Sequence, residues 1–173
     1  MELEEYVAAR GPALLRLAHV LCGDSHRAQD LVQTALVDAF RHWRRVQRAD
    51  HPDAYVRRIL VNAHLAAVRK RSSGEVPVGE VPDGAGPDGA DPADGVAGRD
   101  GFRAALDGLP PRARTVLVLR YWSDLDDVAI ADALGVSPVT VRATASRALA
   151  TLRERAAAPA TTTTTTTTTG EEP

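Results

Sequence analysis

Apolar side chains recur at helical spacing throughout the first 71 residues. The period predicts three helices, over residues 2–22, 26–46 and 52–71. Gly23 ends the first helix, and Asp24 or Ser25 can cap the second. Pro52 opens the third helix, at a position where a missing amide proton costs nothing.

The same period assigns a buried face to each helix. In the second helix the apolar stripe runs on to Phe40, which we expect in the core together with Trp43. In the third helix Val61 is left for an outer or flanking face. The buried side of this helix is expected to comprise Val56, Ile59, Leu60, Ala63 and Ala67.

A second pattern, over residues 126–155, predicts two helices that meet at Gly135. Val128, Ile130, Ala131 and Leu134 supply the apolar positions of the first helix, and Val141, Ala145, Ala148 and Leu152 those of the second. A small residue at 131, a glycine at 135 and an apolar anchor at 141 form the spacing of a helix-turn-helix, whose second helix enters the DNA major groove. An ordinary helical hairpin in an all-α core is the alternative.

Composition separates these two patterned regions. Residues 72–100 are rich in Gly, Pro, Asp and Ala, and they carry too few large apolar side chains to offset their ordering entropy. We therefore expect an all-α protein of two small helical domains, at residues 1–71 and 101–157. A flexible acidic linker would separate the domains, and a disordered threonine-rich tail would follow at residues 158–173.

The net charge of −2 hides a strong segregation of charge. Acidic residues gather at the start, in residues 75–100 and at the end of the chain, whereas arginines gather in residues 41–71 and in the last helix. Basic stretches of this kind can attract phosphates, although solvated helix faces give the same pattern.

Several classes of function are disfavoured. Cys22 is the only cysteine, which excludes an internal disulfide and a multi-cysteine zinc site. The start of the chain is acidic, unlike a signal peptide, and no apolar run is long enough to span a membrane, so we expect a soluble cytoplasmic protein without membrane insertion. The five histidines are scattered and no nucleophile motif or phosphate-binding loop appears, so we expect no enzyme activity, no catalytic residues, no metal and no cofactor.

Three motifs, in order, resemble those of bacterial sigma factors of the extracytoplasmic-function (ECF) group. RAQDLVQTAL at residues 27–36 resembles their polymerase-binding helix, and PDAYVRRILVN at residues 52–62 resembles their −10 recognition helix. LPPR at residues 109–112, followed by the helix-turn-helix, resembles their −35 binding domain. The resemblance is strongest to the small SigE-like branch of actinobacteria.

The resemblance implies a sigma factor that directs core RNA polymerase to promoters. It implies contact with the β′ clamp helices of core polymerase through Asp30, Leu31, Gln33 and Thr34, besides contact with the β flap. It implies recognition of the −10 element by Arg48, His51, Arg57, Arg58 and Asn62. It implies recognition of the −35 element by Thr140, Arg142, Ala143, Thr144 and Arg147. An anti-sigma factor is a further implied partner.

Two other classes use parts of the same sequence. A helix-turn-helix regulator that acts without polymerase would need residues 126–155 but neither the 27–36 nor the 52–62 motif. A helical adaptor that binds only protein would not need segregated arginines. Co-purification with core polymerase separates the sigma factor from the regulator, which binds its operator without polymerase.

Overall fold

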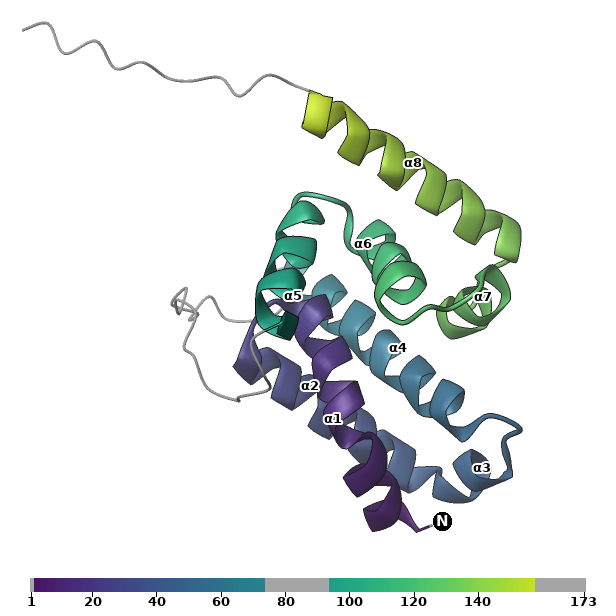
Figure 1. The fold of residues 1–173 in the computed structure, drawn as a ribbon. Coiled ribbons are helices and arrows are strands. Elements are labelled where there is room, and N and C mark those ends of the chain that lie inside the picture. Colours follow the sequence, from purple (N-terminus) through teal and green to yellow (C-terminus); the bar gives the residue numbers. More distant parts are fainter. Residues whose placement is uncertain (1, 74–93, 158–173) are drawn as a thin grey trace, which may run out of the picture.

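The computed structural model describes residues 2–73 and 94–157, and every regular element within these ranges is helical (Figure 1). The predicted all-α class is therefore confirmed. The N-terminal domain comprises α1 (Leu3–Cys22), α2 (Ser25–Arg41), α3 (Trp43–Arg48) and α4 (Pro52–Ser72). The C-terminal domain comprises α5 (Asp94–Ala105), α6 (Pro111–Leu117), the π-helical turn η1 (Val118–Trp122), α7 (Asp127–Leu134) and α8 (Pro138–Ala157).

Local sequence signals set most of the helix ends in the N-terminal domain. Gly23 closes α1 in the left-handed region, with φ of 73°, and the Asp24 carboxylate caps α2 by accepting the amide proton of Arg27 at 2.7 Å. The single predicted helix over 26–46 is wrong, because the chain breaks at His42. The imidazole Nδ1 of His42 lies 2.9 Å from the Asp38 carbonyl oxygen, a local bond that competes with continued helix.

The core of the N-terminal domain forms where α1, α2 and α4 pack together. Tyr6 of α1 meets Trp43 edge-to-face, with ring centroids 5.5 Å apart. Val56 and Leu60 of α4 are fully buried, as the helical period predicts, whereas Ala67 is exposed. A three-helix core of this kind fixes α4 against α1 and α2.

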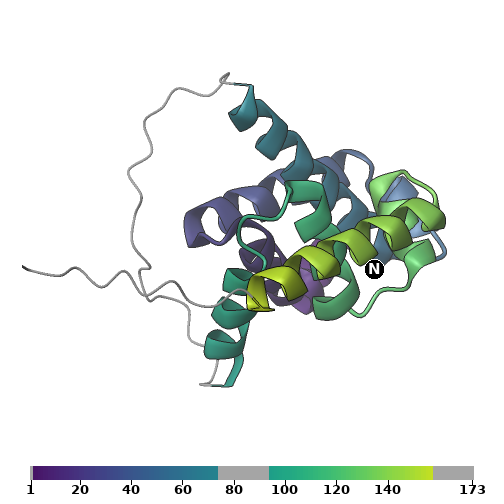
Figure 2. The same ribbon diagram turned by 90° about the horizontal axis from the view of Figure 1, so that it is seen from above.

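The two domains are not separate, contrary to the sequence-based expectation. Helices α6 and α7 pack on α4 (Figures 1 and 2). Val61 is 0% exposed and His64 5% exposed, so of the two positions expected for Val61, outer or flanking, the structure has the flanking one, and it is buried. The two residues share a stripe with Arg57 at i, i+4 and i+7, next to the stripe that faces α1 and α2. The C-terminal domain therefore buries a second face of α4.

A second contact between the domains joins α5 to α1. Helix α5 begins at Asp94, earlier than the start near residue 101 expected from composition, and it packs on α1. Gly23 permits this approach, since a Cβ at that position would lie 2.5 Å from the guanidinium Nη1 of Arg103. The rest of the expected linker, residues 74–93, and the tail from residue 158 lie outside the described residues.

The helix-turn-helix has the predicted construction. Gly135 ends α7 with φ of 64°, and Ala131 and Val141 are buried at 2% and 1% exposure. The Ser137 hydroxyl accepts the amide proton of Thr140 at 3.2 Å and so caps α8. One expectation is wrong: Val128 is exposed, since only one face of α7 meets the core.

No single helix among the described residues is long and apolar enough to cross a membrane. Among these residues α7 and α8 are long and apolar enough only when the two are taken together, and they are bent by 101° relative to each other.

Gly135→Ala tests the left-handed end of α7. No atom lies within 4 Å of a Cβ at this position, so the cost is confined to the backbone. We expect the free energy of unfolding to fall by roughly 1–2 kcal/mol, the cost of the left-handed conformation for a residue with a Cβ. Urea denaturation followed by circular dichroism measures it.

Gly101→Ala is the matched control, because Gly101 lies exposed in α5 with open space around its Cα. It should leave stability unchanged or raise it by up to about 1 kcal/mol. Equal losses in the two variants would contradict the role given to Gly135.

Candidate nucleic-acid and protein interfaces

The N-terminal half of α8 presents its polar side chains away from the core. Val141 and Ala145 face inward, whereas Thr144 is half-buried at the edge of the outer face. The remaining −35 candidates are exposed: Thr140, Arg142, Ala143 and Arg147. The five predicted −35 residues therefore share the accessible surface of one helix, as groove reading requires.

The hydrogen bonds of these residues differ. The Thr140 hydroxyl lies 2.9 Å from the Ser137 hydroxyl, so it belongs to the cap of α8. Arg147 donates its Nε proton to the Ala143 carbonyl at 3.3 Å, which lays its side chain along the helix. Arg142 instead reaches across to α7, where its Nε lies 3.5 Å from Asp127 Oδ2. Only Arg142 is thus tied to another element of the helix-turn-helix.

The −10 candidates divide into two groups. Arg48, His51, Arg58 and Asn62 are exposed, and Arg58 and Asn62 lie one turn apart on the same face of α4. Arg57 is half-buried and lies on the stripe that faces the C-terminal domain. In this arrangement Arg57 is not part of the exposed −10 surface.

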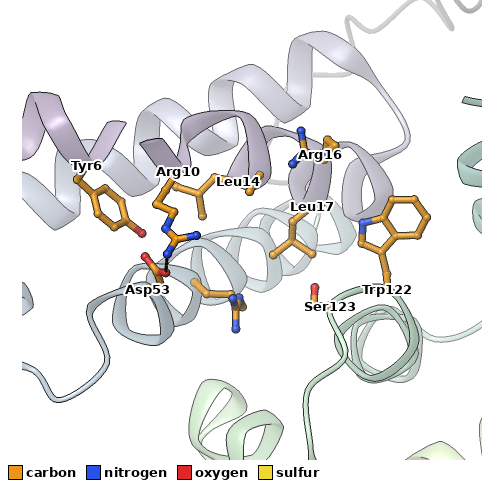
Figure 3. A pocket seen from close by; sticks show the side chains of 10 residues that line it. Tyr6, Arg10, Leu14, Arg16, Leu17, Asp53, Trp122 and Ser123 are labelled. Carbon is orange, nitrogen blue, oxygen red and sulfur yellow. Dashed lines mark ion pairs between the residues drawn. The ribbon is translucent and has the colours of Figure 1, made fainter. Parts of the chain in front are cut away.

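Arg57 lines a pocket of about 240 Å³ at the junction of α1, α4 and η1 (Figure 3). Arg10 and Asp53 form an ion pair across it at 3.0 Å, and Trp122 and Ser123 close it from the C-terminal domain. Burial raises the pKa of the Tyr6 phenol far above its usual range, and the neighbouring Asp53 carboxylate raises it further. The pocket is therefore a polar seam between the domains. The sequence offered no signal for it, because its walls come from both domains.

The predicted polymerase-binding residues lie on both sides of α2. Asp30, Gln33 and Thr34 are exposed, but Leu31 is only 7% exposed and belongs to the core. Leu31 therefore cannot offer a docking surface in this structure.

Two apolar side chains that sequence reasoning missed complete the outer face of α2. Val37 is 51% and Phe40 65% exposed, so the prediction of a buried Phe40 is wrong. The signal was present in the spacing, because residues 33, 37 and 40 follow i, i+4 and i+7 on the side opposite Ala28 and Ala35. Exposed Phe and Val beside polar groups are typical of a protein-binding surface.

Cys22 and His64 form a partly buried contact between Sγ and Nδ1 at 3.8 Å. Burial raises the pKa of the Cys22 thiol to about 11 and lowers the pKa of His64 to about 4, and the guanidinium groups of Arg71 and Arg114 lower the His64 value further. A protonated thiol beside a neutral imidazole is a poor nucleophile–base pair. The contact is therefore a structural part of the α1–α4 packing.

Two segments of the chain match known families. Residues 6–74 match Sigma-70 region 2, and residues 99–152 match Sigma-70, region 4. The RNA polymerase sigma-E factor of Streptomyces coelicolor is 39% identical over 158 residues, which span 89% of this chain and 85% of that protein. This chain belongs to the RNA polymerase sigma factor family.

Other relatives of this sigma factor agree. The RNA polymerase sigma-E factor of Streptomyces avermitilis is 41% identical over 154 residues, 89% of this chain and 84% of that protein. The ECF RNA polymerase sigma factor SigE of Mycolicibacterium smegmatis is 31% identical over 159 residues, 89% of this chain and 61% of that protein. The resemblance to the SigE-like ECF group is confirmed.

A solved structure shares the fold of this sigma factor. It is the sigma factor RpoE in complex with the anti-sigma factor NepR from Bartonella quintana, with a TM-score of 0.66 and 26% identity. The similarity covers 87% of this chain and 94% of that one, so it takes in both domains.

The low pKa of His64 makes stability depend on pH. Between pH 6.5 and about 4 the unfolded chain binds a proton at this residue that the folded protein does not, so the free energy of unfolding falls as the pH falls. The shift from 6.5 to about 4 sets an upper limit of roughly 3 kcal/mol on this loss. Denaturant titrations at intervals of pH measure it.

His64→Gln should flatten the dependence of stability on pH over this window, whatever its effect on stability at pH 7. His26→Gln, at an exposed histidine of α2, should leave the dependence unchanged. If the free energy of unfolding changed with pH in the same way in the unaltered protein and in His64→Gln, His64 would not be the source of the pH dependence.

Proposed function

We propose that this sigma factor divides its work between three exposed surfaces: the outer face of α2 for core polymerase, the Arg58–Asn62 face of α4 for the −10 element, and α8 for the −35 element. One observation carries the proposal. The two sigma-70 segments occur in order, and each contains a helix whose predicted contact residues are largely exposed.

The α2 surface combines an apolar centre with polar edges. Val37 and Phe40 supply apolar area, and Asp30, Gln33 and Thr34 supply hydrogen-bonding groups beside it. Aromatic side chains are common energetic anchors of interfaces. We assign Phe40 that role against the β′ clamp helices of core polymerase, in place of the buried Leu31.

The two DNA surfaces differ in chemistry. Asn62 offers an amide that suits a base edge, while Arg58 and the nearby Arg48 and His51 can hold phosphates. On α8, Arg142 is the candidate for a bidentate contact to guanine, and Thr140, Ala143, Thr144 and Arg147 lie around it. Sequence reading is thus assigned to Asn62 and Arg142, and positioning to the other cations.

The two domains have to move apart for the protein to bind both promoter elements at once. The two elements lie roughly 25 base pairs apart, which is about 85 Å at 3.4 Å per base pair. Helices that pack together lie only about 8–10 Å apart. With α7 against α4, one molecule cannot hold both elements of a straight duplex. We propose that an anti-sigma factor, the class of partner bound to the Bartonella relative, stabilises the packed form.

We further propose that the protein acts in the cytoplasm, where core polymerase acts, as an initiation factor that is not itself an enzyme. A helix-turn-helix regulator that works without polymerase is not supported. It gives no reason for a sigma-70 region 2 segment at residues 6–74.

Phe40→Ala tests the polymerase surface. Because Phe40 is exposed, the melting temperature should stay unchanged, while affinity for core polymerase should fall about tenfold, or roughly 1.4 kcal/mol. Leu15→Ala, at the exposed apolar residue of α1, is the control and should leave affinity intact. Equal affinities for all three proteins would exclude Phe40 as an anchor.

Arg142→Ala and Asn62→Ala test the division between the two promoter elements. Reconstituted core polymerase transcribes promoters mutated singly in each element. Arg142→Ala should reduce discrimination at one −35 base by about 1–3 kcal/mol, and Asn62→Ala should relax one −10 base and slow open-complex formation.

If Arg142→Ala changed the −10 preference and Asn62→Ala changed the −35 preference, the assignment of each domain to its promoter element would be wrong. Absence of any promoter-specific transcript, with binding of an operator by the protein alone, would favour the polymerase-independent regulator.

A further inference from the structure

The pairing of Arg142 with α7 is part of a short ionic chain. Asp127, the first residue of α7, pairs through Oδ1 with Nη2 of Arg120 in η1, and its Oδ2 lies 3.5 Å from Nε of Arg142. Three successive elements, η1, α7 and α8, are thus linked by one carboxylate. These three linked side chains carry two positive charges and one negative charge, so the group keeps a net positive charge.

The two ends of this chain differ in exposure. The side chains of Arg120 and Asp127 are 24% and 26% exposed, whereas that of Arg142 is 64% exposed. Arg120 therefore anchors the carboxylate at the domain surface, and Arg142 is the partner that extends into solvent. Exposed ion pairs contribute little to stability, so the consequence of this contact lies in orientation.

We propose that Asp127 is a positioning residue for −35 recognition: its ion pair on the Nε side of Arg142 orients the guanidinium and leaves the two terminal nitrogens to read a base. This inference rests on the base-reading role proposed for Arg142. A guanidinium has five N–H donors in a planar fork, and guanine O6 and N7 need two of them, side by side. A contact at Nε leaves Nη1 and Nη2 available for that purpose.

Holding the side chain before DNA arrives lowers the rotamer entropy lost on binding. The benefit is realised only where the base fits the fork. Asp127 should therefore raise the preference for the correct base more than it raises affinity for promoter DNA as a whole. As an anion near the phosphates, Asp127 should also weaken binding to every sequence alike.

These two effects have opposite signs, which makes Asp127→Asn a sharp test. Holoenzyme carrying each variant is measured for binding to a promoter selected from a library with a randomised −35 element, and to its single-base −35 derivatives. At the base that Arg142→Ala identifies, Asp127→Asn should reduce the preference about three- to tenfold. Binding to the mismatched derivatives should stay the same or tighten.

Asp132→Asn is the matched control. Asp132 is exposed on the same helix and makes no ion pair with any described residue. The substitution removes the same charge, so it should change binding to all promoters alike and leave base preference intact. If both variants shift binding equally, with preference unchanged, Asp127 acts only as a charge and the proposal is overturned.

Arg142→Lys provides a second arm in case Asp127→Asn perturbs folding, which the melting temperature reports. Lysine keeps the positive charge but lacks both the Nε that pairs with Asp127 and the planar guanidinium that makes a bidentate contact. It should lose the same base preference, and adding Asp127→Asn to it should have no further effect on preference. Retained preference in Arg142→Lys would overturn the proposal.

The outcomes also distinguish a failure of the positioning role of Asp127 from a failure of the base-reading role of Arg142. If Arg142→Ala leaves every −35 preference unchanged, Arg142 reads no base and both proposals fall. If Arg142→Ala relaxes one base while Asp127→Asn relaxes none, only the positioning role of Asp127 is lost.

Discussion

Burial of the second stripe of α4 beneath α6 and α7 ties the two domains of this sigma factor together. Val61 is fully buried on this stripe, and His64 at its edge also contacts Cys22 of α1. Full burial of a valine side chain contributes roughly 1.5–3 kcal/mol. A few such residues hold the domains at moderate strength, as in other interfaces within a chain. The contact is therefore strong enough to define the arrangement and weak enough to be displaced by a larger interface.

This burial also decides which functional groups are accessible. The Arg58–Asn62 face of α4 and the outer face of α8 remain open, whereas Arg57 is half-buried and lines the pocket between α1, α4 and η1. The packed form thus exposes part of each proposed DNA surface, and under the proposed function these surfaces would have to move apart on a promoter. Exposure of a contact residue and competence for promoter binding are separate properties here.

Sequence reasoning succeeded where structure is decided by neighbours along the chain. Gly135, Ala131 and Val141 could be placed because a helix-turn-helix has fixed spacing, and Pro52 and Gly23 because helix ends have local rules. It failed where a distant element intervenes. Nothing local indicates that α7 covers Val61, or that α2 leaves Phe40 outside. The ionic chain through Asp127 was missed for the same reason, because it depends on side-chain directions across three elements.

The second contact between the domains, where Arg103 of α5 lies against Gly23 at the end of α1, makes the association bivalent. When α7 leaves α4, the α5–α1 contact still holds the domains near each other, so the released surfaces meet again at a high effective concentration. Complete separation requires the contacts of α4 with α6 and α7 and those of α1 with α5 and η1 to be lost together. A partner that competes only for the surface of α4 would leave the molecule hinged about α1.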